Sequence, residues 1–194
     1  MKRLFDLTVA LTLLSITAPL LVVIAALVAF ELHKAPIYVS KRVGRDGRLF
    51  GLFRFRTMTR IYRPDDPLET HQLSRVGAVI RNYSLDDLPN LLNVLIGDLS
   101  IIGPRPMEAE RVDPLDPHWR RILSVRPGCV GLAVLSLART YNESDPRTKQ
   151  QMELEYVERQ SLLFDLKLFA QAWRDHFRSS GNIKARGEPH ASPQ

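Results

Sequence analysis

The apolar N-terminal stretch constrains the fold of this chain more than any other feature of the sequence. Leu4 to Phe30 is a run of 27 residues with a single charge, Asp6. As one straight helix it would be about 40 Å long, against a hydrocarbon core of roughly 30 Å. Pro19 lies near the middle, where a proline removes a backbone hydrogen bond and clashes with the preceding turn. We therefore expect a membrane helix that is kinked or broken at Ala18 and Pro19.

Three placements of this stretch relative to a membrane follow. Each half, at roughly 20 Å, is too short to cross alone, so a re-entrant helix-break-helix that enters and leaves on one face is the leading one. Basic residues flank the stretch on both sides: Lys2 and Arg3, then Lys34, Lys41, Arg42 and Arg45. Such flanks favour the cytoplasmic side, which agrees with re-entry. A single kinked crossing is the second placement. A cleaved signal peptide is the least favoured, because proline directly after Ala18 is a poor cleavage context.

The remainder of the chain is one domain's worth of sequence with an uneven charge. The 194 residues are 45% hydrophobic, with a mean hydropathy of −0.12 and a formal net charge of +6. Residues 41–63 hold eight basic side chains and one acid. This patch suits nucleic acid, anionic lipid headgroups or a polyphosphate substrate. A single cysteine, Cys129, excludes an intramolecular disulfide and a cysteine metal cluster, and we expect it to be small, buried and not a nucleophile.

Residues 37–56 have the pattern of a β-hairpin. Residues 37–39 form the first strand, Gly44 to Gly47 the turn, and Leu49 to Phe55 the return strand. Arg54 and Arg56 lie two residues apart and so share a face. Their charges could simply keep an edge strand soluble. Residues 61–73 indicate a mobile loop, which could cover a site, although most such loops only connect elements.

The segment RNYSLDDLPNLLNVLIGDLSIIGPRP, residues 81–106, contains the strongest candidate for a chemical site. Asp86 and Asp87 are adjacent acids, and we expect a helix that begins between Ser84 and Asp86 and ends at about Ile96. The acids would then lie at the positive end of a helix dipole, where backbone N–H groups can also face a phosphate. The alternative is an ordinary helix cap with an acidic neighbour.

Three arginines in and after this segment favour phosphate chemistry over an ordinary cap. Arg81 precedes the acids, Arg105 is held between two prolines, and Arg126 stands before Pro-Gly in RPGCVG. Rigid turns of this kind orient a guanidinium for bidentate phosphate binding. Further along, residues 145–159 indicate a polar helix and residues 162–177 an amphipathic one, which packs on the core or lies in a membrane interface.

Taken together, the proline-interrupted N-terminus, RVGRDGRLF…RFRTM, residues 81–106 and RPGCVG resemble the bacterial sugar transferase family, the small monotopic phosphoglycosyl transferases that act on polyprenyl phosphate. The resemblance covers residues 1–180. It implies an α+β fold, mainly α, with a re-entrant membrane helix (residues 1–35). A β-hairpin and a helical catalytic domain (36–180) would lie at the membrane surface, followed by a disordered tail (181–194).

The resemblance also implies a reaction and its site residues. In that family the first acid of the pair attacks the β-phosphate of a nucleotide diphosphate sugar, and polyprenyl phosphate then takes the phosphosugar. Asp86 would be the nucleophile, and Asp87 a Mg²⁺ ligand or its organiser. The arginines that would bind substrate phosphates are Arg54, Arg56, Arg81, Arg105 and Arg126. We expect a UDP-sugar donor and contact with membrane lipid at the cytoplasmic face of the bacterial inner membrane, in a surface-glycan pathway. No nucleic acid partner is expected, and a homo-oligomer is left open.

Three departures from the family pattern bear on this assignment. Asp87 replaces the usual glutamate and is one methylene shorter, and Ala18 replaces the serine before the helix proline. The stretch after Arg126 lacks the usual threonine and glutamine, which we expect to alter nucleotide or sugar recognition. Two other hypotheses stand beside the covalent enzyme. One is direct displacement with Asp86 as base or metal ligand. The other is a non-enzymatic membrane-surface module that binds anionic lipid or nucleic acid, and it gives no reason for the paired acids.

Overall fold

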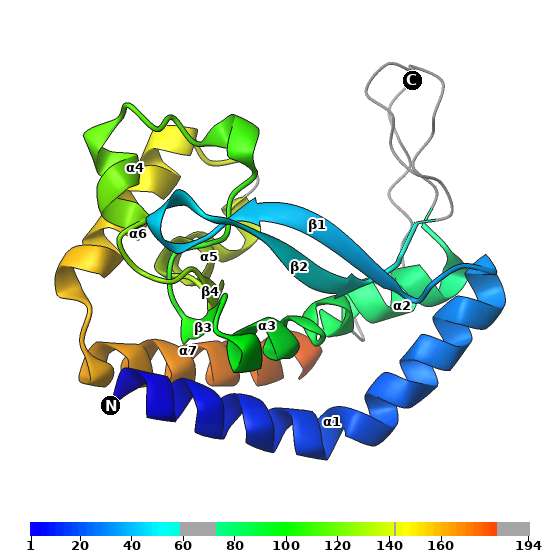
Figure 1. Cartoon of the computed structure of the whole chain (residues 1–194). Coiled ribbons are helices and arrows are strands. Elements are labelled where there is room, and N and C mark those ends of the chain that lie inside the picture. Colours follow the sequence, from blue (N-terminus) through cyan, green and yellow to red (C-terminus); the bar gives the residue numbers. More distant parts are fainter. Residues whose placement is uncertain (59–72, 142, 182–194) are drawn as a thin grey trace.

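The apolar stretch forms helix α1, Lys2–Leu32, in the computed structural model, which describes residues 1–58, 73–141 and 143–181. The helix is continuous and bends near its middle, where Pro19 lies (Figure 1). Of the predicted kink or break, the helix has the kink: one proline removes a single hydrogen bond, and the turns on either side keep theirs. Within the described residues α1 alone is long and apolar enough to cross a membrane, judged by length and composition. Re-entry or crossing stays a prediction.

The hairpin is formed as predicted. Strand β1, Ile37–Val43, pairs antiparallel with β2, Leu49–Phe55, in a register that places Ile37 opposite Phe55. A 3-10 turn at Arg45–Gly47 joins them, and Gly47 takes the left-handed conformation (φ 76°) that the reversal requires. The predicted loop at residues 61–73 lies, except for its last residue, outside the described residues.

The acids lie between two helices instead of in the first turn of one. Helix α2, Arg75–Asn82, is followed by a 3-10 turn at Leu85–Asp87, and helix α3 is Asn90–Ile96. The prediction of one helix from Ser84–Asp86 to Ile96 was wrong at its start. Because Pro89 has no N–H, the carbonyl of Leu85 accepts its hydrogen bond from Leu88 N (3.2 Å), which makes the turn tighter than an α-helix.

Two short parallel strands bring the proline-held arginine turns together. Strand β3, Ser100–Ile102, pairs with β4, Gly128–Val130, and helix α4, Pro117–Ile122, lies between them in sequence. Beyond the strands the backbones remain in contact: Gly103 N donates to the carbonyl of Val130 (3.0 Å), and Gly128 N to that of Pro104 (2.8 Å). A side chain at Gly128 would collide with Gly103, so only glycine allows this approach.

The C-terminal half is helical. Helix α5 is Leu132–Leu137, α6 is Pro146–Arg159 and α7 is Leu162–Gly181. Asp145 caps α6 by accepting hydrogen bonds from the N–H groups of its first turn. Helix α7 runs beside the first half of α1 (Figure 1), where Phe5 and Phe169 meet edge to face with ring centroids 5.8 Å apart. The mainly helical α+β fold is confirmed, and residues 182–194 of the predicted tail lie outside the described residues.

Charged residues fasten the first turns of α1 to this body. Lys2 Nζ lies 2.6 Å from Asp165 Oδ2 on α7, and the Asp6 carboxylate accepts a hydrogen bond from Ser100 Oγ (2.8 Å). Arg3 donates to two carbonyls at the end of α3. Asp6 and Asp165 are both buried, at 2% and 0% exposure. Removing this segment would leave the Asp165 carboxylate without its cation, so the packing favours a retained helix over a cleaved signal peptide.

Candidate active site

The two adjacent acids face two neighbouring cavities. Asp86 lines a cavity of about 310 Å³ between the hairpin and α2. Asp87 lines a smaller one of about 50 Å³, enough for a few water molecules. Arg42 and Arg54 line both cavities and form the wall where they meet. The tight turn at Leu85–Asp87 therefore presents each carboxylate to a different space with shared cations.

Asp87 is held by the hairpin and by α3. Arg54 Nε lies 2.7 Å from Asp87 Oδ1, and Asn90 Nδ2 lies 3.4 Å from the same oxygen. The fully buried Asn93 fixes the distance between these elements: its amide donates to the carbonyl of Gly51 (2.7 Å) and accepts from Phe53 N (3.0 Å). The side chain of Asn93 thereby ties α3 to β2 and places Arg54 above Asp87.

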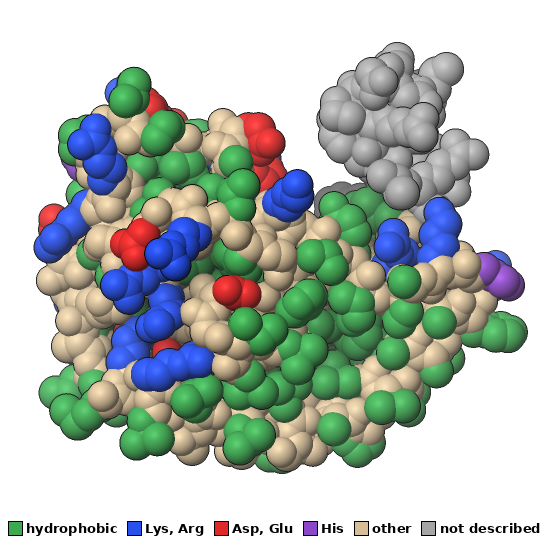
Figure 2. All heavy atoms as spheres, in the orientation of Figure 1, with side chains coloured by type: hydrophobic (Ala, Val, Ile, Leu, Met, Phe, Trp, Pro, Cys, Tyr) green, Lys and Arg blue, Asp and Glu red, His purple; other side chains and the backbone are tan. Residues whose placement is uncertain are grey.

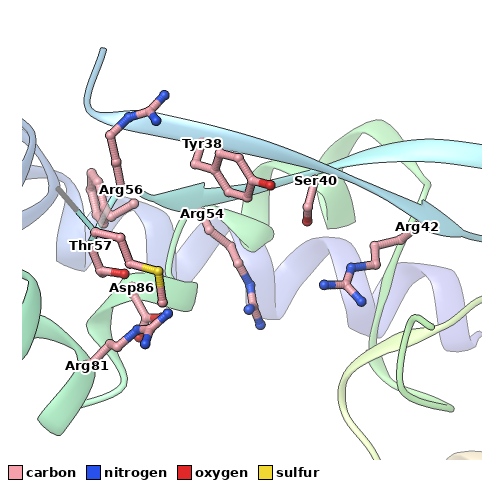
Figure 3. A pocket seen from close by; sticks show the side chains of 10 residues that line it. Tyr38, Ser40, Arg42, Arg54, Arg56, Thr57, Arg81 and Asp86 are labelled. Carbon is pink, nitrogen blue, oxygen red and sulfur yellow. The ribbon is translucent and has the colours of Figure 1, made fainter. Parts of the chain in front are cut away.

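The ionised form of Asp86 is less stable than that of an ordinary aspartate. Partial burial raises the pKa of its carboxyl group, and the adjacent charge of Asp87 raises it further, while Arg54 and Arg81 act in the opposite direction. Figure 3 shows Asp86 and Arg81 close together to the left of the Arg54 side chain, on the same side of the hairpin. A carboxylate that is only partly stabilised by its neighbours retains more nucleophilic character than a fully paired one.

The other predicted arginines have different positions. Arg105 lines the smaller cavity, and its guanidinium carbon lies 5.0 Å from the centroid of the Tyr141 ring. Arg56 lines the larger cavity, but its guanidinium points to the opposite side of the strand (Figure 3), where Nε donates to the carbonyl of Ala35 (3.0 Å). Arg126 lines a third cavity, with Arg45, Arg48, Asp98 and other residues, and donates to the carbonyl of Gly97 (2.9 Å).

Sequence reasoning missed three residues of the site: Ser40, Arg42 and Asn90. Tyr38, Ser40 and Arg42 alternate along β1 and so face the larger cavity together, as Figure 3 shows. That period of two was a usable signal. Asn90 was hidden because the helix was expected to begin before it; in the structure it is the first residue of α3, three residues after Asp87.

The structure corrects the prediction made for Cys129. It was predicted to be buried, and it is exposed to the smaller cavity instead. Dense protein surroundings on its other sides, together with the charges of Asp87 and Asp6, raise the pKa of the thiol to about 12. At neutral pH it is therefore a protonated thiol, which agrees with its reading as a residue that is not a nucleophile.

The smaller cavity has donors that suit a hard cation. Among the described residues, no three His, Cys, Asp or Glu side chains come together as a metal site. Mg²⁺, however, is commonly held by one or two carboxylates together with substrate phosphates. Asp87 offers a carboxylate, and the amide oxygen of Asn90 is buried without a hydrogen-bond partner among the described residues. These donors fit Mg²⁺ that arrives with a phosphorylated substrate.

An apolar helix long enough to cross a membrane, judged by length and composition, is joined to a domain whose cavities combine paired carboxylates with arginines, the combination that suits an enzyme acting on phosphorylated substrates at a membrane. More specifically, the chain belongs to the bacterial sugar transferase family, whose model matches residues 1–179.

Curated relatives agree with this family. The chain is 34% identical to the uncharacterized sugar transferase EpsL of Bacillus subtilis, over 93% of this chain and 89% of that protein. It is 33% identical to the exopolysaccharide production protein ExoY of Rhizobium meliloti, covering 85% and 80%. A third relative is the UDP-glucose:undecaprenyl-phosphate glucose-1-phosphate transferase of Caulobacter vibrioides, with 32% identity over 86% of this chain and 66% of that protein.

Proposed function

We propose that this protein transfers a sugar 1-phosphate from a nucleotide diphosphate sugar, a UDP-sugar, to polyprenyl phosphate through a covalent intermediate on Asp86. The observation that carries the proposal is the position of the acids: Asp86 and Asp87 face separate cavities that share Arg54. A nucleophile and a cation-binding acid need this separation, because each must reach a different part of one diphosphate. The names of the relatives that use undecaprenyl phosphate support the same substrates.

The reaction has two displacements at one phosphorus atom. An Asp86 carboxylate oxygen attacks the β-phosphorus, and the bond to the bridging oxygen breaks, so the nucleoside monophosphate leaves with that oxygen. A phosphate oxygen of polyprenyl phosphate then attacks the same phosphorus and releases the Asp86 carboxylate. Arg54 and Arg81 line the same cavity as Asp86 and would offset the charge of the transferred phosphate. The product is a polyprenyl diphosphate sugar.

Mg²⁺ is part of this proposal. Asp87 and the amide oxygen of Asn90 would hold it, and when bound it would offset the negative charge that otherwise repels a carboxylate nucleophile. Arg54, whose Nε lies 2.7 Å from Asp87 Oδ1, would offset part of the same negative charge. Arg105 faces the same cavity from its proline-held turn and offers a further cation to the diphosphate.

The membrane-bound acceptor requires the site to lie at a bilayer surface, which we place at the cytoplasmic face of the inner membrane. Figure 2 shows hydrophobic side chains gathered along the edge formed by α1. Leu4, Ile16 and Val22 are 71%, 71% and 69% exposed on that helix, and Leu163 on α7 is 80% exposed. Such exposed apolar surface favours lipid contact over water. The prenyl chain could then stay in lipid while its phosphate reaches Asp86.

The test is intact mass spectrometry of the protein in detergent or lipid, incubated with Mg²⁺ and a panel of UDP-sugars. The expected result is a phosphosugar-sized adduct on the wild type and none on Asp86→Asn, whose amide cannot attack phosphorus. Turnover should fall to background in the same variant. Measurable turnover by Asp86→Asn would overturn the covalent mechanism, and kinetics that require a ternary complex would favour direct displacement.

A further inference from the structure

Arg42 is a cation of the site without an assigned role. It lies on β1 at the wall between the two cavities, and only 19% of its side chain is exposed. Its Nη2 lies 3.0 Å from Glu108 Oε1. The second oxygen of Glu108 lies 3.1 Å from Arg111 Nε, so this carboxylate is clasped by two arginines. Glu108 thus contacts the guanidinium at Nη2 and leaves the other N–H groups of Arg42 to the cavities.

One of the Arg42 donors outside the printed contact with Glu108, Nε, is buried. Arg42 Nε has no hydrogen-bond partner among the described residues, and the same is true of Ser40 Oγ and Asn90 Oδ1. All three residues line one or both of the cavities beside the acids. Buried polar atoms are almost always hydrogen-bonded in native proteins, so unpaired ones gathered at one place indicate a polar ligand.

The charges around Arg42 point to an anionic ligand. Arg54 and Arg105 line the smaller cavity with it. Burial lowers the pKa of the Arg42 guanidinium, and repulsion from Arg54 and Arg105 lowers it further, against the favourable charge of Glu108. A dianionic or trianionic phosphate group between these side chains would relieve that repulsion and supply acceptors for their N–H groups.

We propose that Arg42 binds a phosphate of the diphosphate substrate across the wall between the two cavities, and that Glu108 is a positioning residue that fixes the orientation of its guanidinium. The inference rests on the proposed function and adds to it a phosphate contact from the first strand of the hairpin. A role for Arg42 as an ordinary surface ion pair would leave Nε buried without a partner.

The first experiment measures anion binding without turnover. Inorganic pyrophosphate is titrated calorimetrically into the full chain in detergent micelles, for the wild type and four variants. Arg42→Gln should weaken binding at least about tenfold, because a charge-assisted bidentate contact is lost. Arg42→Lys should recover part of the loss, since it restores the charge without the planar fork. Glu108→Gln should weaken binding by a smaller factor, about threefold.

The matched control is Lys41→Gln, which removes the same charge from the neighbouring exposed residue on β1. It should bind pyrophosphate within about twofold of the wild type. Equal affinities for Arg42→Gln and the wild type, or no binding to the wild type, would overturn the inference. If Arg42→Gln does not fold, Arg42→Lys and Glu108→Gln decide the question, and wild-type affinity in both would count against it.

A second measurement separates this inference from the proposed function. Donor KM and kcat are determined for the same variants with polyprenyl phosphate as acceptor. Wild-type turnover with an unchanged donor KM and kcat in Arg42→Gln would refute the role of Arg42 alone. Pyrophosphate binding that depends on Arg42, in a protein that forms no adduct and releases no nucleoside monophosphate, would refute the proposed function and leave the anion site standing.

Discussion

At the scale of one residue, the buried carboxyl group of Glu153 beside the turn that holds Arg105 predicts a stability that depends on pH. It is 5% exposed, and Oε1 accepts a hydrogen bond from Arg105 N (3.3 Å). Burial raises the pKa of Glu153 from 4.5 to about 7, against the lowering effects of the Arg105 backbone and charge. Below pH 4.5 both folded and unfolded chains hold the proton. Between pH 4.5 and 7 the folded chain keeps the proton and the unfolded chain releases it. Raising the pH through this range therefore lowers the free energy of unfolding.

Glu153→Gln removes this pH-dependent loss of stability. The stability of the variant relative to the wild type should rise from pH 4.5 to 7 by at most roughly 3 kcal/mol, and level off above it. Denaturation midpoints at several pH values in one detergent measure this difference. Glu155→Gln, an exposed change on the same helix, is the control and should follow the wild type. A constant gap between Glu153→Gln and the wild type across the range would contradict the raised pKa.

At the same scale, the sequence indicated some of the residues that line the two cavities and missed others. Asp86, Asp87 and Arg105 are on tight turns that local residues define, and the structure places them on the two cavities. Arg126 has an equally rigid turn, yet its guanidinium reaches a different cavity, which depends on the position of α3. Alternation along β1 indicated the face on which Arg42 lies, but its place on the same cavity as Asp87 depends on how the hairpin packs.

At the scale of elements, the contact between the β3 and β4 ends predicts an intolerant position. A Cβ atom on Gly128 would lie 2.1 Å from Gly103 N, a backbone atom that cannot rotate away. Gly128→Ala should therefore destabilise the protein by about 3 kcal/mol or more, because the strands must separate. Thermal denaturation of both proteins in detergent measures the loss.

The matched control for that change is Gly47→Asn at the hairpin turn. Apart from Gly47 and its two chain neighbours, no atom of the described residues lies within 4 Å of the carbon that would be added there, and asparagine tolerates a φ of 76°. This variant should stay within about 1 kcal/mol of the wild type. If Gly128→Ala is as stable as Gly47→Asn, the backbones do not meet as closely as described.

Element types followed from the sequence where local patterns decide them. The hairpin alternation and its glycine turn, and the Asp-Pro start of α6, define their own hydrogen bonds and were predicted correctly. The helix after Ser84 was misplaced because one missing N–H, that of Pro89, turned the first residues into a 3-10 turn. The β3–β4 pair was not foreseen, since three-residue strands carry little periodicity and pair across a long separation in sequence.

At the scale of the whole molecule, the Lys2–Asp165 pair predicts a strong coupling between helices α1 and α7. Asp165 is fully buried and also accepts a hydrogen bond from Tyr156 OH (2.7 Å). Lys2→Met should destabilise the protein by about 3 kcal/mol, because it leaves a buried carboxylate without a cation. Asp165→Asn should cost less when Lys2 is already methionine.

A double-mutant cycle on chemical denaturation in detergent measures this coupling. The expected coupling free energy exceeds about 1 kcal/mol. Strictly additive losses would mean that each side chain is stabilised by other partners and that α1 is held to the body by its apolar contacts alone.

The same pair has a consequence for biosynthesis. Lys2 and Asp165 are 163 positions apart in the chain, and a ribosome adds roughly 5–20 residues per second. The apolar helix is thus translated many seconds before its partner carboxylate exists. In the membrane placement proposed above, the lipid bilayer, and not the protein body, would shelter α1 during that interval. Membrane targeting of the nascent chain would therefore precede assembly of the catalytic domain, which can close only once α7 has emerged.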